Sequence, residues 1–355
     1  MRLQKEIKIV LILSLFIIIL PRTFIFSQSK IIVEKEDAHK LPQNTIDIID
    51  FNTVVIKEKD QIQIVNISDS SNYEILFSYN LPEGKNYHSI QHGRYIILKD
   101  KTTKYYFQSV FDVSTKQLLD LQEPDGSVGA VRVAQKDKVI IYNKRYGEIF
   151  YDVNGKRRIQ KMEVKLKNFK GETKIIVDSV RGSLWCPNEQ WFLASKFLRR
   201  EGTEVKWERA LYNRDGLKVS LPSELTSISQ AVWSSDGNYL AIRQSSKLTV
   251  IEFEWNKNIP QVKRFISKSH FGSKILFSPD GNYIIYVKSY DDGHRVFGND
   301  IMLTDNTLSF IEPLIEHKEI IEIPISWTTE QNLITQDETS VKFSKNIYKY
   351  KIKYK

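Results

Sequence analysis

A short phrase occurs twice in this chain, with its two copies starting 44 residues apart. The first copy is "AVWSSDGNYLAIRQS" (Ala231–Ser245), and the second is "ILFSPDGNYIIYVKS" (Ile275–Ser289). Each is an apolar run that ends in an aromatic residue, followed by a polar turn and an alternating apolar run. Asp-Gly between two β-type runs predicts a hairpin, because Gly accepts a positive φ and Asp can bond its own backbone nearby. We therefore interpret Asp236 and Asp280 as turn residues rather than catalytic carboxylates.

Weaker copies of this layout extend through the whole chain. They are "IDIIDFNTVVIKEKD" (Ile46–Asp60), "HSIQHGRYIILKD" (His88–Asp100), "VRVAQKDKVIIYNK" (Val131–Lys144), "LWCPNEQWFLASKF" (Leu184–Phe197) and "ISWTTEQNLITQD" (Ile325–Asp337). The seven turns fall near residues 51, 92, 136, 188, 236, 280 and 330. A repeat of roughly 41 to 52 residues is typical of one blade of a β-propeller.

Four strands are expected in each repeat. After Tyr239–Gln244, for example, come "KLTVIEFEW" (Lys247–Trp255) and "QVKRFIS" (Gln261–Ser267), and then the next repeat begins. No segment beyond the N-terminal leader shows a sustained helical period, and β-branched and aromatic residues dominate. The sequence therefore predicts an all-β fold, a seven-bladed β-propeller of four-stranded blades that occupies residues 30–355 as one domain.

The two ends of the chain predict how the ring closes. The last repeat is one strand short, with its third strand in "NIYKYKIKYK" (Asn346–Lys355), whereas Ile31–Glu36 precedes the first repeat without a partner. We expect Ile31–Glu36 to be the outer strand of the last blade, because an open propeller would leave unpaired edges. The alternating lysines of the last strand are interpreted as a solvated face rather than a nucleic-acid site.

The first 29 residues read as a signal peptide or an uncleaved membrane anchor. Arg2, Lys5 and Lys8 precede a short apolar run, Ile9–Leu20. That run is typical of a signal-peptide core, whereas an anchor requires its extension through Phe26. No Cys lies near this segment, which excludes lipoprotein modification. Both alternatives predict an extracytoplasmic location.

The chain has a formal net charge of +9, of which about five charges lie beyond the leader. This modest excess is compatible with an anionic envelope polymer or lipid surface, or simply with solubility, and nucleic acid is not expected as a partner. Membrane contact is expected only through an uncleaved leader, and the protein is expected to be a monomer. Cys186 is the single cysteine, so no intramolecular disulfide can form, and we expect it to be a buried apolar residue.

Three of the repeats carry a family resemblance. Phe277–Tyr286 closely matches the TolB-type, WD40-like propeller repeat of bacterial envelope and secreted proteins, Trp233–Ile242 nearly matches it, and Trp185–Ala194 is a degraded match. The Gly-His and Trp-Asp dipeptides of eukaryotic-type WD repeats are missing. The resemblance implies a propeller that often serves as an interaction platform, and it implies no catalytic residues.

Motifs of enzymatic chemistry are missing from the sequence. It has no Gly-x-Ser-x-Gly elbow, phosphate loop or dinucleotide fingerprint, and its six His are scattered. We therefore predict no catalytic residues, no metal site and no cofactor. Two function hypotheses stay open. One is a non-catalytic protein- or glycan-binding scaffold, and the alternative is a propeller lyase or hydrolase acting on a polysaccharide or small metabolite at the central channel.

The candidate binding surface lies opposite the Asp-Gly turns, where irregular insertions are expected. These are Asn143–Glu148, Phe197–Ala210, Ser267–Ser273 and Ser289–Asp300. Arginines there would hold carboxylate or phosphate, and a tyrosine would offer a stacking face. The predicted binding residues are Arg145, Tyr146, Arg199, Arg200, His270, Asp291, Asp292, His294 and Arg295. Asp291 and Asp292 could alternatively serve acid–base chemistry or bind calcium, and all nine could instead lie at mobile loop tips.

Overall fold

The structure is a computed structural model. It describes residues 31–354 apart from 70–71, 102–106, 124–125, 152–156, 179, 202–203, 226–227, 270, 292–295, 317–320 and 338–345. The described residues form strands and turns, arranged as seven antiparallel four-stranded sheets. Within this part of the chain no helix could span a membrane. The leader, residues 1–29, lies outside the described residues.

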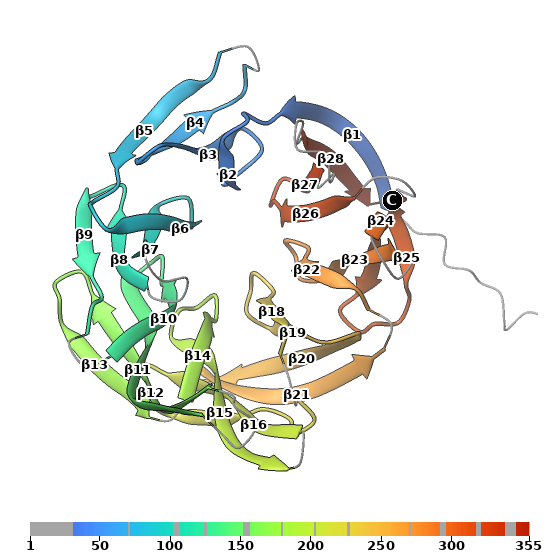
Figure 1. Cartoon of the computed structure of the whole chain (residues 1–355). Coiled ribbons are helices and arrows are strands. Elements are labelled where there is room, and N and C mark those ends of the chain that lie inside the picture. The colour runs from blue at the N-terminus through green and yellow to red at the C-terminus, as the bar shows by residue number, and fades with distance from the viewer. Residues whose placement is uncertain are drawn as a thin grey trace, which may run out of the picture.

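The seven sheets are the blades of a β-propeller, which confirms the predicted fold (Figure 1). Blade 1 comprises β2 (Thr45–Ile48), β3 (Thr53–Glu58), β4 (Gln61–Asn66) and β5 (Glu74–Asn80). Blade 2 comprises β6 (Lys85–Gln91), β7 (Tyr95–Asp100), β8 (Phe107–Asp112) and β9 (Gln117–Asp120). Blade 3 comprises β10 (Gly126–Val133), β11 (Val139–Tyr151), β12 (Arg157–Asn168) and β13 (Thr173–Asp178). Blade 4 comprises β14 (Val180–Trp185), β15 (Trp191–Glu201), β16 (Glu204–Asn213) and β17 (Lys218–Ser220).

The remaining three blades follow the same order from the inside of the ring to the outside. Blade 5 comprises β18 (Gln230–Trp233), β19 (Tyr239–Gln244), β20 (Lys247–Asn256) and β21 (Ile259–Lys268). Blade 6 comprises β22 (Ser273–Phe277), β23 (Tyr283–Asp291), β24 (Val296–Asp305) and β25 (Glu312–Ile315). Blade 7 comprises β26 (Glu322–Trp327), β27 (Asn332–Asp337), β28 (Asn346–Tyr354) and β1 (Ile31–Lys40).

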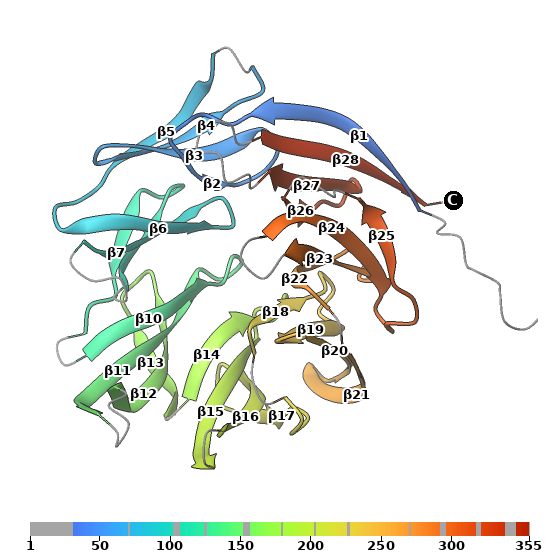
Figure 2. The ribbon, with the colours of Figure 1, turned by 45° about the vertical axis from the view of Figure 1, so that its right-hand side comes forward.

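Blade 7 joins the two ends of the chain, as the sequence predicts. The outer strand β1 pairs antiparallel with β28 along its length, from Ile31 opposite Tyr354 to Lys40 opposite Asn346 (Figure 2). The predicted strand, Ile31–Glu36, is thus four residues too short. Ion pairs from Lys353 to Glu34 (2.5 Å) and from Lys349 to Glu36 (3.0 Å) join the two strands. The lysine-rich face of the last strand therefore meets the acidic residues of β1.

The hydrophobic core is divided among the interfaces between neighbouring blades. Each of the seven interfaces has its own cluster of buried apolar side chains. Between blades 7 and 1, for example, Ile334 and Ile347 pack with Val54, Phe51 and Leu41. Burying this apolar area on both sides of each blade is the main force that holds the ring together. The ring is therefore closed by core packing as well as by β1.

The Asp-Gly turns have the structural role that the sequence predicts. In the turn before β23, the Ser278 hydroxyl donates to Asp280 Oδ1 (2.5 Å), which also accepts from the Asn282 backbone N–H (3.1 Å). Gly281 has φ +73°. Burial opposes ionisation of Asp280, but hydrogen bonds from Ser278 and Asn282 outweigh it and lower the pKa of this carboxyl. The same bonds recur at Ser234, Asp236 and Asn238 in blade 5.

Buried amides join neighbouring blades, a feature that the sequence analysis missed. The Asn143 side chain of β11 donates to the Gly182 carbonyl of β14 (3.1 Å) and accepts from the Gly182 N–H (3.0 Å). Asn299 of β24 makes the same two bonds with the backbone of Glu322 in β26. We call these pairs amide bridges. They satisfy backbone groups at a free strand edge, where an unpaired buried group would be costly.

Candidate functional site

The strand order divides the propeller into two faces. The turns between the first and second strands of each blade lie on one face, which we call the turn face. The connections between the second and third strands lie on the opposite face together with the links between blades. The second and third strands of blades 3, 4 and 6, which form hairpins towards that opposite face, are long, with up to 13 residues in β11. The corresponding strands of blades 1 and 2 have 6 residues each. We call the opposite face the long-hairpin face.

The structure places five of the nine predicted binding residues on these long hairpins. Arg145 and Tyr146 lie within β11, Arg199 and Arg200 within β15, and Asp291 ends β23. The backbone there is paired β-structure with a register irregularity in each hairpin, between Tyr146 and Ile149, between Phe197 and Arg199, and between Tyr290 and Asp291. The expected irregular insertions are thus bulged extensions of the strands. His270, Asp292, His294 and Arg295 lie outside the described residues, and the side chains of Arg199, Arg200 and Asp291 are likewise not described. Their role in binding stays a prediction.

Arg145 and Tyr146 lie beside each other on the blade 3 hairpin, but on opposite sides of the sheet. The Arg145 guanidinium packs over β10, where a Cβ on Gly129 would lie 3.1 Å from Arg145 Nη2. Lys144 Nζ lies 5.3 Å from the centre of the Tyr146 ring. Desolvation and a hydrogen bond with Glu163 raise the pKa of the Tyr146 hydroxyl. The tyrosine ring is thus held by its own hairpin.

A buried ionic cluster fixes the base of this hairpin. Glu123, in the link between blades 2 and 3, lies 2.9 Å from Lys165 Nζ and 3.5 Å from Lys144 Nζ. The Tyr142 hydroxyl donates to the same carboxylate (2.7 Å). Burial opposes ionisation of Glu123, but the hydrogen bonds from Tyr142 and Lys165 and both ammonium charges prevail, so its pKa is lowered. No local sequence signal indicates this cluster, because its members are up to 42 residues apart.

The blade 3 hairpin carries a large excess of positive charge. Residues 139–168, from the start of β11 to the end of β12, contain eight Lys and Arg but only three Asp and Glu. Residues 31–355 as a whole carry the same excess of five positive charges. The rest of the propeller is therefore formally neutral. Such a local excess creates a positive field that attracts polyanions.

The inner strands surround the ring axis (Figure 1). Several of them contain an extra residue in mid-strand. Pairing is irregular around Ile46 in β2, His88 in β6, Lys274 in β22 and Ile325 in β26. Such bulges redirect side chains away from the ladder. Ile46 and Ile325 line a cavity of about 150 Å³ between blades 1 and 7.

His88 is the histidine among these bulged residues. Its side chain is exposed. Desolvation and the positive charges of Lys99 and Arg132 lower the pKa of its imidazole, against the opposing charge of Asp47. This environment therefore disfavours the protonated imidazole. The His88 imidazole is the side chain that a lyase or hydrolase reaction at the central channel could use as an acid or base.

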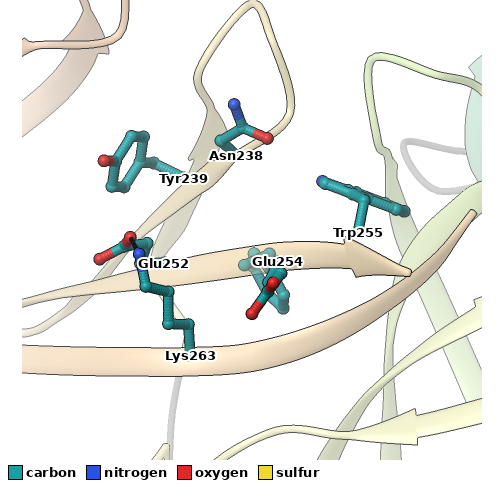
Figure 3. Close-up of a pocket in the computed structure, with 7 residues that line it drawn as sticks. Asn238, Tyr239, Glu252, Glu254, Trp255 and Lys263 are labelled. Atoms are coloured by element: carbon teal, nitrogen blue, oxygen red, sulfur yellow. Dashed lines mark hydrogen bonds and ion pairs between the residues drawn. The ribbon is translucent and has the colours of Figure 1, made fainter.

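A groove of about 400 Å³ opens at the turn face of blade 5 (Figure 3). Figure 3 shows Tyr239 and Trp255 on opposite sides of Asn238, with Glu254 beneath them. Lys263 Nζ lies 2.6 Å from Glu252 Oε1, and Arg264 Nη2 lies 2.8 Å from its other oxygen. These ion pairs lower the pKa of Glu252. The sequence analysis did not identify this groove, since it regarded the turn face as structural.

Cys186 is buried beside Trp185, as predicted. Burial raises the pKa of its thiol to about 12, so the nucleophilic thiolate is not populated near neutral pH. Among the described residues, no group of three or more His, Cys, Asp and Glu side chains is placed to hold a metal ion.

Comparisons with known proteins match only solved structures. No family model and no curated protein matches this chain. Dipeptidyl peptidase 4 of Porphyromonas gingivalis aligns with 13% sequence identity and a TM-score of 0.53, over 86% of this chain and 50% of that one. The uncharacterized protein lmo1340 of Listeria monocytogenes aligns with 12% identity and a TM-score of 0.50, over 84% of this chain and 91% of that one.

TolB from Acinetobacter baumannii also aligns, with 10% identity and a TM-score of 0.38 over 85% of this chain and 80% of that one. That value is too low to bear on the TolB-type resemblance, which stays a prediction. The chain spans about half the length of the dipeptidyl peptidase. At these identities the likeness shows one thing, that the chain folds as a β-propeller.

Proposed function

We propose that this protein is a non-catalytic binding protein on the outer side of the cytoplasmic membrane, and that the blade 3 hairpin binds an anionic polymer of the cell envelope. The observation that carries the proposal is the charge distribution. One hairpin holds an excess of five positive charges, equal to that of the whole propeller, and the charges of the remaining residues sum to zero.

The outer part of the hairpin supplies the binding groups. Lys144 and Lys165 are committed to Glu123 at its base. Arg157, Arg158 and Lys161 lie on the β12 backbone beyond that base, towards the tip. Arginine binds phosphate and carboxylate groups through two parallel hydrogen bonds, which suits a repeating anionic polymer. Several such contacts along one polymer chain would add together as multivalent binding.

The direction of β1 supports a partner other than the lipid surface. Ile31 pairs with Tyr354 at the end of β28, which lies at the turn face. Ile31 therefore lies at the turn face, and the long-hairpin face is on the opposite side of the propeller. If the leader remains as an anchor, the blade 3 hairpin faces away from that membrane.

The test is binding to immobilised teichoic acid, with immobilised heparin as a second polyanion. The measured quantity is the salt concentration at which the protein elutes. We expect R157E/R158E to elute at markedly lower salt than the wild type, because it reverses charge at the hairpin. K136E/K138E is the matched control. It changes the net charge equally in the same blade, but its two residues, the exposed Lys136 and the half-buried Lys138, lie in the turn between β10 and β11 on the turn face. Equal loss in both variants would refute a localised site.

The enzyme alternative has less support. Dipeptidyl peptidase 4 is named as a peptidase, but a structural likeness at 13% identity shows the fold alone. His88 is a titratable group beside the ring axis, and no described geometry yet gives it a reaction. The alternative stays a prediction of the sequence.

A further inference from the structure

The groove at the turn face of blade 5 is built by unequal strand lengths. Tyr239, the first residue of β19, pairs with Glu252 of β20. The last four residues of β20, Phe253–Asn256, extend past β19 and pair with Ile259–Val262 of β21. The hairpin of β20 and β21 therefore projects beyond the neighbouring turn, and the groove is the space between them.

The walls of this groove are held rigidly. The Phe253 N–H donates to the Asn238 carbonyl (2.8 Å), and Trp255 Nε1 donates to the Gly237 carbonyl (3.2 Å). The turn itself is fixed by Asp236, which accepts from both the backbone and the side-chain amide of Asn238. A site that is already ordered loses little conformational entropy when a ligand binds.

The one cation among the described residues that line the groove is paired with a carboxylate. Of the two carboxylates that line it, Glu252 lies within hydrogen-bond distance of Lys263 and of Arg264, which is not part of the lining, and Glu254 is the second. The described lining therefore has no unpaired cation with which to select an anionic ligand. It offers instead a mixture of fixed acceptors and donors, together with the rings of Tyr239 and Trp255.

This combination suits a neutral sugar. The apolar C–H face of a sugar ring packs on an aromatic ring, while its hydroxyls, which both donate and accept, match carboxylate and amide groups. The side-chain NH2 of Asn238 donates to Asp236, which leaves the side-chain oxygen, Oδ1, of Asn238 as an acceptor. Glu254 is exposed on the same side, and the volume is that of a small-ligand site.

We propose that the blade 5 groove binds a neutral oligosaccharide through Tyr239, Trp255, Glu254 and Asn238. The site lies on the turn face, opposite the cationic hairpin, and does not depend on the anionic partner proposed above. The protein would then contact two envelope components, one on each face.

The test is to titrate the full protein with cellotetraose, maltotetraose and chitotetraose. Binding is monitored by isothermal titration calorimetry and by saturation-transfer NMR. We expect at least one of them to bind, and Y239A/E254A to bind it at least tenfold more weakly. The matched control is Y73A/E74A, an exposed Tyr-Glu pair at the start of β5 on blade 1. This control is expected to bind as the wild type does.

Two results would overturn the proposal. One is that none of the three oligosaccharides binds. The other is that Y239A/E254A keeps the wild-type affinity, or loses it no more than the control does. Because Tyr239 also packs at the interface of blades 5 and 6, E254A alone is measured if the double variant does not fold. An unchanged affinity in E254A would refute the site equally.

Discussion

Replacing Asn143 by Leu tests whether the amide bridges hold neighbouring blades together. Asn143 is fully buried and bonds both the N–H and the carbonyl of Gly182 across the interface of blades 3 and 4. Leucine fills a similar volume without polar atoms, so it leaves both backbone groups unpaired and admits no water. Each such group costs about 1–3 kcal/mol, and we therefore expect the free energy of unfolding to fall by about 2–6 kcal/mol.

The assay is urea denaturation followed by tryptophan fluorescence and far-UV circular dichroism. Asn143→Ala is expected to lose less stability than Asn143→Leu, because the smaller side chain leaves room for a bridging water. Gln117→Leu is the control, since its exposed amide also donates to a backbone carbonyl, that of Phe169 (2.7 Å). If Asn143→Leu is as stable as Gln117→Leu, the amide bridges do not stabilise the ring and the reasoning fails.

Three further predictions concern single groups. Burial opposes ionisation of Asp112, but hydrogen bonds from Arg94 and Ser114 hold its pKa far below the usual range. The ionised carboxylate therefore stabilises the fold above the unfolded-state pKa of about 3.9, and this stabilisation is lost as the pH falls below that value. In Asp112→Asn, the free energy of unfolding measured by urea denaturation should thus depend less steeply on pH in the acid range. Gly281→Ala should lower the free energy of unfolding by about 1–2 kcal/mol in urea denaturation, because Gly281 has φ +73°. Cys186 should resist alkylation by iodoacetamide at pH 8 in the native protein and react in urea, because burial raises the pKa of its thiol to about 12. Mass spectrometry would measure the alkylation, and rapid reaction of the native protein would contradict the buried placement of this residue.

The sequence by itself determined the repeat and therefore the fold. Asp236-Gly237 and Asp280-Gly281 are local turn signals whose chemistry is complete within five residues, so they can be identified without tertiary structure. Their spacing predicts the blade, and the missing strand of the last repeat predicts the place of Ile31. The sequence did not determine where this strand ends. It predicted Ile31–Glu36, whereas pairing with β28 extends β1 to Lys40.

Only the tertiary structure decided which side chains from different blades meet. Glu123 reaches Lys165, and Asn143 reaches Gly182, across about forty residues that carry no pattern pointing from one to the other. The blade 5 groove exists because β20 extends four residues past β19, a difference in strand length rather than in residue type. Local signals specify turns and strands, but contacts between blades depend on how far each strand extends and which edge it faces, and both are settled when the blades pack.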